Sequence, residues 1–387
     1  MKLVLQKISN MRSLLFILML AAVGFSSTKM YTQTIESDCD CDVTITNKNQ
    51  KFPYNNFNES RNKTICFKGD FKYKLNWAKL GNNISLCIGE DIEFESRGLN
   101  FEGNKTIYNY GDFDYGQQLE LNSNSKIVNY GTMQTKLKFE GGSMENINEA
   151  VLDIESYSNF NSGYLFNDAT SSIKLKQSGY TTLGSNMIFE SRGSSKFKGD
   201  LDNKGKLTIS GKSEFDKKLI NNNRSILSGE LTIKKGYVSN QTNAITEVNA
   251  NLVINGNVNL WQGQLEASAG LNFKRNTTVN SEASINFMGS AKFKNLTLRG
   301  EISTNFSCNT LEIKNASGYG GQLTAKESSS INIDKINTLP SSWILSGNVT
   351  EDNCNNDNEV VVWLGTKSSD TSDDDNWSSK VRRKSSV

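Results

Sequence analysis

The sequence predicts an all-β protein, a parallel β-helix (β-solenoid) in which short strands coil into stacked turns. Three observations indicate this class. Residues 107–111 read Ile-Tyr-Asn-Tyr-Gly and residues 127–131 read Ile-Val-Asn-Tyr-Gly, so a five-residue motif returns after 20 residues. Triplets of the form apolar-x-apolar recur along the chain, as expected for short strands with one buried side. Finally, 30 Gly and only 2 Pro suit a chain that turns often and rarely breaks a hydrogen-bonded ladder.

The two outer residues of each triplet should face the interior and the middle residue should face solvent. One turn alone is unstable, because burying a Leu or Ile gains about 1.5–3 kcal/mol whereas ordering each residue costs about 1–2 kcal/mol. Stacking supplies the missing burial, and Asn or Ser at equivalent turns can add side-chain ladders. The triplets begin at Leu119, Leu137, Ile173, Leu207, Leu231, Leu252, Leu271, Ile285, Leu296, Leu311 and Ile331.

Residues 1–28 have the features of an export signal. Basic residues precede an uninterrupted apolar run at 14–25, and small residues follow at 26–28. Met11 is a second possible start, since a compact signal is already present from there. The apolar run is too short for a permanent anchor. We expect an exported chain that begins near Lys29 and is secreted or held at the extracellular surface, with no transmembrane anchor after cleavage.

The rest of the chain divides into three predicted parts. Residues 29–100 are rich in aromatic residues and Cys, and we expect them to form an N-terminal cap over the first turn, since an open strand row invites pairing with other chains. Residues 101–340 form the predicted solenoid. Residues 341–387 contain one more strand at 360–365 and then a tail that we expect to be disordered.

Six cysteines in an exported chain permit disulfides. Cys66 and Cys87 lie 21 residues apart, close to one turn. Neighbouring strands are about 4.8 Å apart, which a disulfide tolerates, so a link from turn to turn is possible. Pairing of either residue with Cys39 or Cys41 is equally compatible with the sequence, whereas Cys39 and Cys41 are too close to pair with each other. The two remaining cysteines are not assigned.

Composition excludes several classes of function. With 43 basic and 41 acidic residues the formal net charge is +2, so we expect no nucleic-acid partner. The chain contains no His, which excludes Ser-His-Asp and Cys-His nucleophile systems and His-ligated zinc. Any catalysis would have to use carboxylates, Arg, Lys or Tyr.

The segment Phe-Glu-Ser-Arg-Gly occurs twice, at residues 94–98 and 189–193. Some β-helical enzymes that act on acidic polysaccharides use an Arg base together with carboxylate-bound calcium. The residues to test for such chemistry are Glu95, Arg97, Glu190 and Arg192. No cluster of Asp accompanies either Arg, so we expect solvated Arg–Glu pairs rather than a catalytic site.

Calcium could also bind the acidic segments, because the ion prefers several hard oxygen ligands. Asp38, Asp40 and Asp42 would project on one side of a strand, and residues 373–375 are acidic. Neither segment has the spacing of a calcium-binding loop, so we predict no metal site and no cofactor.

Aromatic residues are the candidate ligand surface. Tyr110 and Tyr130 occupy equivalent positions one period apart and should stack, and Trp261 and Tyr319 could add further rings. Rows of aromatic rings bind sugar faces in some proteins, but a stacking ladder that stabilises the solenoid is the favoured interpretation.

The chain resembles large secreted and surface proteins of the Bacteroidetes, which are β-helical and adhesin-like. The resemblance lies in Cys-Asp-Val at 41–43, in the Asn-Tyr-Gly turns, and in Trp363-Leu364-Gly365 followed by Asn376-Trp377-Ser378. Many of those proteins end in a β-sandwich that the type IX secretion system reads. No such sandwich follows Trp377, so we expect a shortened member.

The sequence supports two hypotheses about function. In the first, the protein is a secreted or surface-displayed solenoid that acts as an adhesin-like or structural interaction module without catalysis. Its partner would be a glycan or protein on a host or neighbouring cell. In the second, it is a β-helical polysaccharide lyase or hydrolase that uses Arg and acidic residues with calcium.

Overall fold

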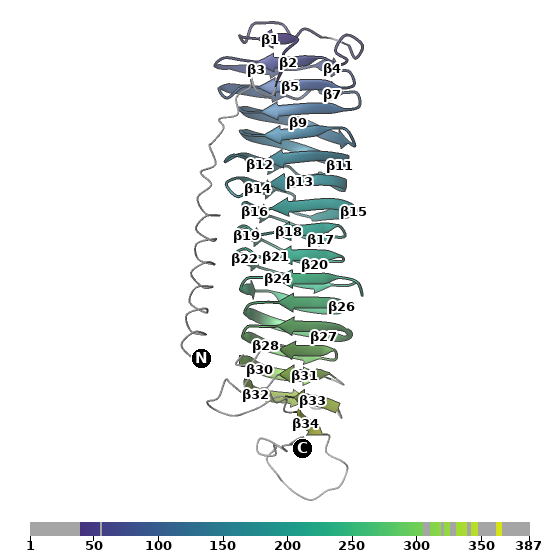
Figure 1. Cartoon of the computed structure of the whole chain (residues 1–387), viewed down its shortest axis with the longest axis vertical. Helices are drawn as coiled ribbons and strands as arrows, with labels where there is room; N and C mark the ends of the chain where they lie inside the picture. Colours follow the sequence, from purple (N-terminus) through teal and green to yellow (C-terminus); the bar gives the residue numbers. More distant parts are fainter. Residues whose placement is uncertain are drawn as a thin grey trace, which may run out of the picture. The chain divides into compact units, whose positions relative to one another are not determined.

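The structure is a computed structural model that describes residues 39–54, 56–304, 310–318, 321–325, 330–338, 342–346 and 361–365. These residues form a parallel β-solenoid of about 14 turns, which confirms the predicted fold class. Figure 1 shows the turns stacked in chain order. The predicted export signal, residues 29–38, Tyr319, the two unassigned cysteines and the tail after residue 365 lie outside the described residues.

Each turn follows three faces in the order 1, 2, 3, and every face is a ladder of parallel strands. Face 1 holds β1 (Val43–Ile45), β2 (Thr64–Phe67), β5 (Ile84–Ile88), β8 (Lys105–Asn109), β10 (Lys126–Asn129), β18 (Lys206–Ile209), β21 (Arg224–Leu227), β24 (Ile245–Val248), β29 (Glu301–Thr304), β31 (Gln322–Ala325) and β33 (Ser342–Ser346). Face 2 holds β3 (Phe71–Leu75), β6 (Ile92–Ser96), β12 (Val151–Ile154), β14 (Ser172–Leu175), β16 (Ser194–Phe197), β19 (Ser213–Phe215), β22 (Leu231–Ile233) and β25 (Leu252–Ile254). Face 3 holds β4 (Ala78–Leu80), β7 (Leu99–Phe101), β17 (Asp200–Asn203), β20 (Lys218–Asn221) and β23 (Gly236–Ser239).

Other strands run continuously around one or two corners. They are β9 (Asp112–Asn122), β11 (Thr132–Asn146), β13 (Asn159–Asn167), β15 (Tyr180–Ser191), β26 (Asn257–Ala267), β27 (Leu271–Phe287), β28 (Ala291–Leu298), β30 (Thr310–Gly318) and β32 (Ser330–Thr338). The last strand, β34 (Val361–Gly365), runs antiparallel to β33 and agrees with the strand predicted near the C-terminus.

Strand register confirms the 20-residue repeat. Ile107 and Asn109 of β8 align with Ile127 and Asn129 of β10. Turn length is not constant, because aligned residues on face 1 differ by 17 positions between β10 and β11 but by 24 positions between β13 and β15. The strands keep their alignment while the corners absorb the difference.

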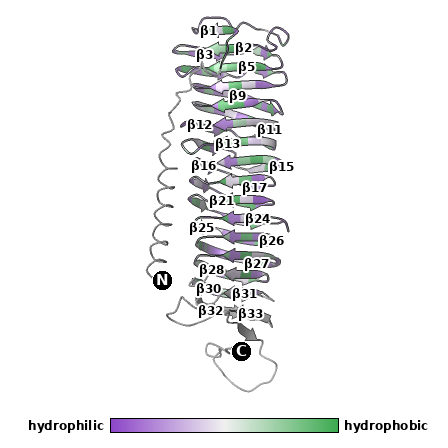
Figure 2. Cartoon of the chain, in the orientation of Figure 1, coloured by the Kyte–Doolittle hydropathy of each residue, from purple (hydrophilic) through white to green (hydrophobic). Residues whose placement is uncertain are grey.

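The interior is a continuous apolar core. The triplet residues predicted to face inward are buried wherever their side chains are described, and Leu231, at 5 % exposure, is the most exposed of them. Aromatic rings stack from turn to turn within the core, with centroids 5.6 Å apart for Phe139 and Phe160 and 4.4 Å apart for Phe197 and Phe215. Figure 2 shows hydrophobic and hydrophilic residues interleaved along the strands, as expected for ladders with one buried side.

Regular turns begin earlier than the predicted boundary at residue 101. β1 aligns with β2, β2 with β5, and β5 with β8, so the Cys-rich segment already belongs to the stack. Phe67 and Tyr73, which were attributed to a separate cap, point into the core instead, where Phe67 contacts Phe94 with ring centroids 5.0 Å apart, whereas Trp77 is 58 % exposed. Cover for the first turn comes from the loop after β1, in which Phe52 stacks on Phe67 at 6.5 Å.

Among the described residues, disulfides form at Cys39–Cys87 and Cys41–Cys66, with Cα separations of 6.5 and 5.8 Å. The turn-to-turn link between Cys66 and Cys87 does not form, although the two residues are aligned on face 1. Each lies between two residues that face the core, and each forms a disulfide with the segment that carries Cys39 and Cys41. The disulfides therefore hold this segment against the first turns.

Candidate ligand-binding surface

The corner between faces 1 and 2 contains a buried ladder of four asparagines. Asn109 donates to Asn129 (2.7 Å), Asn129 to Asn146 (2.7 Å), and Asn146 to Asn167 (2.8 Å) through their side-chain amides. Asn167 continues the ladder to Ser191 Oγ at 3.0 Å. All four asparagines are fully buried. This ladder confirms the prediction that Asn residues at equivalent turns form side-chain columns. It stabilises the corner that holds the candidate tyrosines, because Tyr110 and Tyr130 directly follow Asn109 and Asn129.

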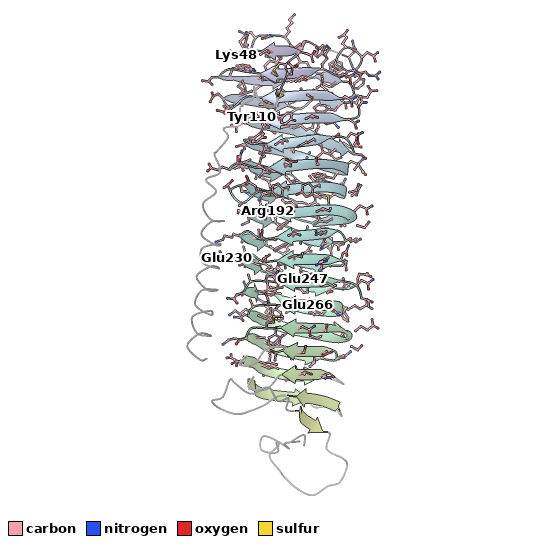
Figure 3. The ribbon with its side chains drawn as sticks, in the orientation of Figure 1. Lys48, Tyr110, Arg192, Glu230, Glu247 and Glu266 are labelled. Atoms are coloured by element: carbon pink, nitrogen blue, oxygen red, sulfur yellow. A yellow bond between two sulfur atoms is a disulfide. The ribbon has the colours of Figure 1, made fainter. Side chains whose placement is uncertain are left out.

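Tyr110 and Tyr130 stack directly, with ring centroids 4.6 Å apart and planes 4° apart. Only 7 % of Tyr110 is exposed, so little of its ring can meet a ligand (Figure 3). Trp261 is 54 % exposed but lies in β26 at the corner between faces 3 and 1. The structure therefore brings the two tyrosines together and places Trp261 on another corner.

The repeated Phe-Glu-Ser-Arg-Gly segments lie on different faces, the first in β6 and the second in β15. In the first, Arg97 Nε lies 3.8 Å from Glu95 Oε1. In the second, Arg192 is 2.8 Å from Glu190 Oε1 and packs over the Phe166 ring at 5.2 Å (Figure 3). Each Arg is paired with the Glu of its own segment, and the two segments do not form one site.

The outer surface of face 2 carries ion pairs between successive turns. Lys72 pairs with Glu93 (3.0 Å), Lys176 with Asp153 (2.7 Å), Lys196 with Glu214 (3.0 Å), Lys234 with Asp216 (2.7 Å) and Lys292 with Glu312 (2.8 Å). In each pair, the lysine and the acidic residue lie on neighbouring turns, so a positive charge on one turn faces a negative charge on the next. Hydrogen bonds from Lys234 and Lys196 lower the pKa of Glu214 to about 2.

One lysine of the described part of the chain is buried. Lys105 is 3 % exposed, its Nζ donates to the backbone oxygen of Glu120, and it packs over the Phe101 ring at 5.6 Å. Burial lowers the pKa of the Lys105 ammonium to about 8. Its backbone oxygen partner and its ring contact make it part of the packing of the corner between faces 3 and 1.

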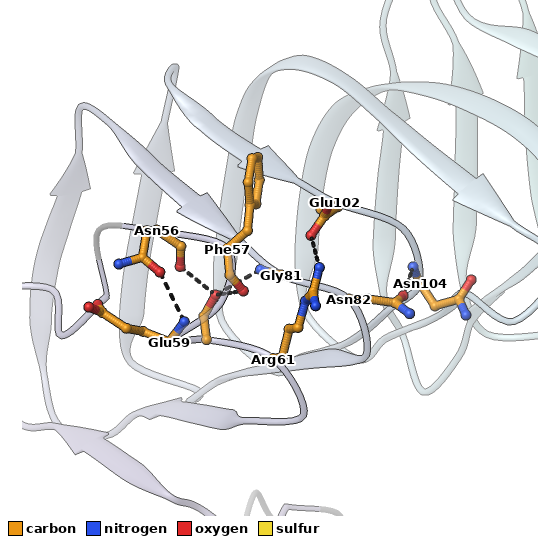
Figure 4. A network of polar contacts seen from close by, with 9 residues as sticks. Asn56, Phe57, Glu59, Arg61, Gly81, Asn82, Glu102 and Asn104 are labelled. Carbon is orange, nitrogen blue, oxygen red and sulfur yellow. Dashed lines mark hydrogen bonds and ion pairs between the residues drawn. The ribbon is translucent and has the colours of Figure 1, made fainter.

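A polar network covers this same corner in the first turns (Figure 4). Arg61 pairs with Glu102 at 3.1 Å, the Gly81 amide donates to Ser60 Oγ at 2.7 Å, and the Asn104 amide donates to Asn82 Oδ1 at 2.7 Å. Arg61, Glu102 and several asparagines line an open recess of about 510 Å³. The polar groups of this recess already bind one another, so it is a structural network.

Acidic residues do not gather into a metal site in the part of the chain that the structure describes, where no group of three or more His, Cys, Asp or Glu side chains has the required geometry. Asp42, one of the acidic residues near the predicted N-terminus, uses one carboxylate oxygen for Lys63 (3.0 Å) and the other for the Thr64 amide (2.8 Å). The Thr64 amide and then Lys63 lower the pKa of this carboxyl.

A basic column that sequence reasoning missed occupies the corner between faces 2 and 3. We call Lys274, Arg275, Lys294 and Lys314 the basic corner. They follow residues 273, 293 and 313, which are aligned on face 2, so the three lysines come from successive turns. All four side chains are exposed, and none forms an ion pair with another described residue. The sequence did contain a signal for this column: Lys274, Lys294 and Lys314 each follow an apolar-x-apolar triplet, at intervals of 20 residues.

The basic corner borders a groove of about 410 Å³ lined by all three of its lysines, and by Lys292 and Glu312. A partly exposed asparagine ladder runs beside it. Asn295 donates to Asn276, and Asn315 to Asn295, both at 2.8 Å. The groove is therefore flanked by charged groups on one side and amides on the other.

No helix among the described residues has both the length and the apolar character needed to cross a bilayer. Comparisons with protein-family models, with curated proteins and with solved structures found no match.

Proposed function

We propose that the protein is a non-catalytic interaction module, exported from the cell or displayed on its surface, in which a β-solenoid presents its lateral faces and corners to a partner. The partner would be a glycan or a protein on a host or neighbouring cell. The observation that supports this proposal best is the ordering of side chains into columns along the stack. Partly exposed amides and exposed ion pairs repeat from turn to turn and so offer a repetitive surface rather than one catalytic pocket.

Two further observations agree with this function. The disulfides Cys39–Cys87 and Cys41–Cys66 are typical of proteins that fold in an oxidising compartment. Arg97 and Arg192, the candidate bases of a polysaccharide-processing enzyme, each contact a Glu two residues away and remain largely exposed. Exposed pairs of this kind are common solvated features of protein surfaces.

The test combines a binding assay with an activity assay on the full chain. We expect binding in a glycan array or adhesion to cells, and no cleavage of a panel of acidic and neutral polysaccharides. Absence of both binding and adhesion would refute an interaction module. Cleavage that Arg192→Ala abolishes and Arg97→Ala preserves would instead establish the polysaccharide-processing alternative at the Arg192 segment.

A further inference from the structure

We propose that the basic corner binds a linear acidic polysaccharide laid along the stacking direction. This inference rests on the proposed function and names the surface and the chemical class of its ligand. The column of lysines provides the periodicity, because strands in a ladder are about 4.8 Å apart. A polymer with an anionic group on regularly spaced sugar units can contact one lysine per turn.

The charge pattern at this corner differs from the rest of face 2. Elsewhere a lysine is followed or preceded on the next turn by Asp or Glu, as in Lys176 with Asp153 or Lys234 with Asp216. At Lys274, Lys294 and Lys314 the same sign occurs on three successive turns, and no described acidic residue forms an ion pair with them. The turn before Lys274 has Asn255 at the aligned position and the turn after Lys314 has Asp334, so the like-charged column spans these three turns. Like charges at this spacing repel each other, so the column is unfavourable for the free protein and would be relieved by a bound polyanion.

Among the described residues that line the groove, Glu312 is the only acidic one, and Lys292 already neutralises it at 2.8 Å. The turn before Lys274 has no basic residue at this corner (residues 255–257), but earlier turns carry further basic residues that form no ion pair with a described residue: Lys198, Lys217, Lys218 and Lys235. Asp200 and Asp216 are the acidic residues among them, and Asp216 is paired with Lys234. The net charge of +2 for the whole chain therefore conceals a local excess of positive charge.

The neighbouring surface favours a polysaccharide over a nucleic acid. Face 3 of the adjoining turns has no acidic residue and presents amides and hydroxyls, which hydrogen-bond to sugar hydroxyls; its segments are residues 257–260, 276–279, 295–298 and 315–318. Single-stranded nucleic acids are usually held by exposed aromatic rings on which bases stack. The two rings that line the groove, Phe273 and Phe293, are 1 % and 2 % exposed, and they face the core.

The test measures binding of the full chain to four polymers: heparin (sulfated), polygalacturonate (carboxylated), dextran (neutral) and single-stranded DNA. One variant carries Lys274→Gln, Lys294→Gln and Lys314→Gln. Its charge-matched control carries Lys48→Gln, Lys51→Gln and Lys206→Gln, which are exposed lysines away from the basic corner without ion pairs to described residues (Lys48 is labelled in Figure 3).

We expect the corner variant to bind heparin and polygalacturonate about 100-fold more weakly at low salt, since each lysine near an anionic surface contributes about a factor of five. The slope of log affinity against log salt should fall by about three, because three fewer counterion-releasing contacts remain. The control should bind like the wild type, and dextran should not bind. Circular dichroism should show that both variants keep the β-solenoid.

Three results would overturn the inference: no binding of either anionic polysaccharide by the wild type, equal loss in the control and corner variants, or single-stranded DNA bound as tightly and through the same lysines. These outcomes are distinct from failure of the proposed function. Adhesion or binding to other glycans without binding of anionic polymers would refute only the basic corner, whereas cleavage of a bound polymer would refute the non-catalytic function.

Discussion

Replacing Asn146 by Ala should destabilise the turns that share the buried ladder. Asn146 accepts from Asn129 and donates to Asn167 Oδ1 (2.8 Å) and to the backbone oxygens of Ala150 (3.1 Å) and Ser172 (3.0 Å). Removal of its amide leaves Asn167 Oδ1 without its donor inside the core, which costs about 1–3 kcal/mol. Loss of the remaining bonds and the small cavity add about 1 kcal/mol each. We expect a loss of stability of about 3 kcal/mol or more.

Hydrogen exchange is the appropriate assay, because repeat arrays can open locally without unfolding as one unit. A loss of about 3 kcal/mol corresponds to exchange about 150-fold faster for protected amides in the affected turns. Peptides covering residues 129–172 should show this increase, and peptides from residues 270–300 should not.

The matched control is Asn104→Ala. Asn104 belongs to an exposed ladder, in which its side-chain amide lies 3.4 Å from Asn83 Oδ1, so its removal should change stability by no more than about 0.5 kcal/mol. Equal acceleration of hydrogen exchange by Asn146→Ala and Asn104→Ala, each in its own turns, would refute this reasoning. It would show that burial of the asparagine ladder does not explain the ladder's contribution to stability.

Three other perturbations have defined outcomes. Replacing Cys39 and Cys87 by Ser should remove about 4 kcal/mol from the first turns, given a separation of 48 residues, and a Cys66–Cys87 peptide in non-reducing mass mapping would contradict the observed pairing. The pKa of Glu214 is lowered to about 2, so its contribution is present above about pH 4.5 and is lost as the pH falls toward 2; Glu214→Gln should flatten the acid side of the melting temperature profile slightly, and an unchanged profile would show that the pair is energetically neutral. Tyr130→Ala should cost about 1 kcal/mol beyond loss of buried area, by removing the stack on Tyr110, and should leave glycan binding intact; loss of binding with unchanged stability would reverse that assignment.

The sequence predicted the fold class and the inward-facing residues because both depend on local alternation. Leu119 and Leu121 are buried and Glu120 between them is exposed, as a period of two requires. The spacing of Asn109 and Asn129 was also visible, since this pair belongs to turns of 20 residues. Disulfide pairing was not predictable, because Cys66 could reach three partners and the path of residues 39–41 over face 1 is a tertiary feature.

Features that depend on several turns were the hardest to predict. Aligning columns requires the register of every turn, and the length of a turn varies between 17 and 24 residues. Tyr110 and Trp261 therefore could not be assigned to different corners from their spacing. The basic corner was overlooked for a related reason: total charge averages over the molecule, whereas Lys274, Lys294 and Lys314 are grouped by register.

Variable turn length also makes this chain a natural scaffold for engineering. The corner at Tyr157 lies between β12 and β13, where the residue has φ of +70° and 80 % exposure, yet the flanking strands remain aligned with their neighbours. A foreign epitope inserted there would project outward without disturbing the adjoining ladder. Insertions at the equivalent corner of several turns would array such epitopes along a line, at intervals set by the strand spacing.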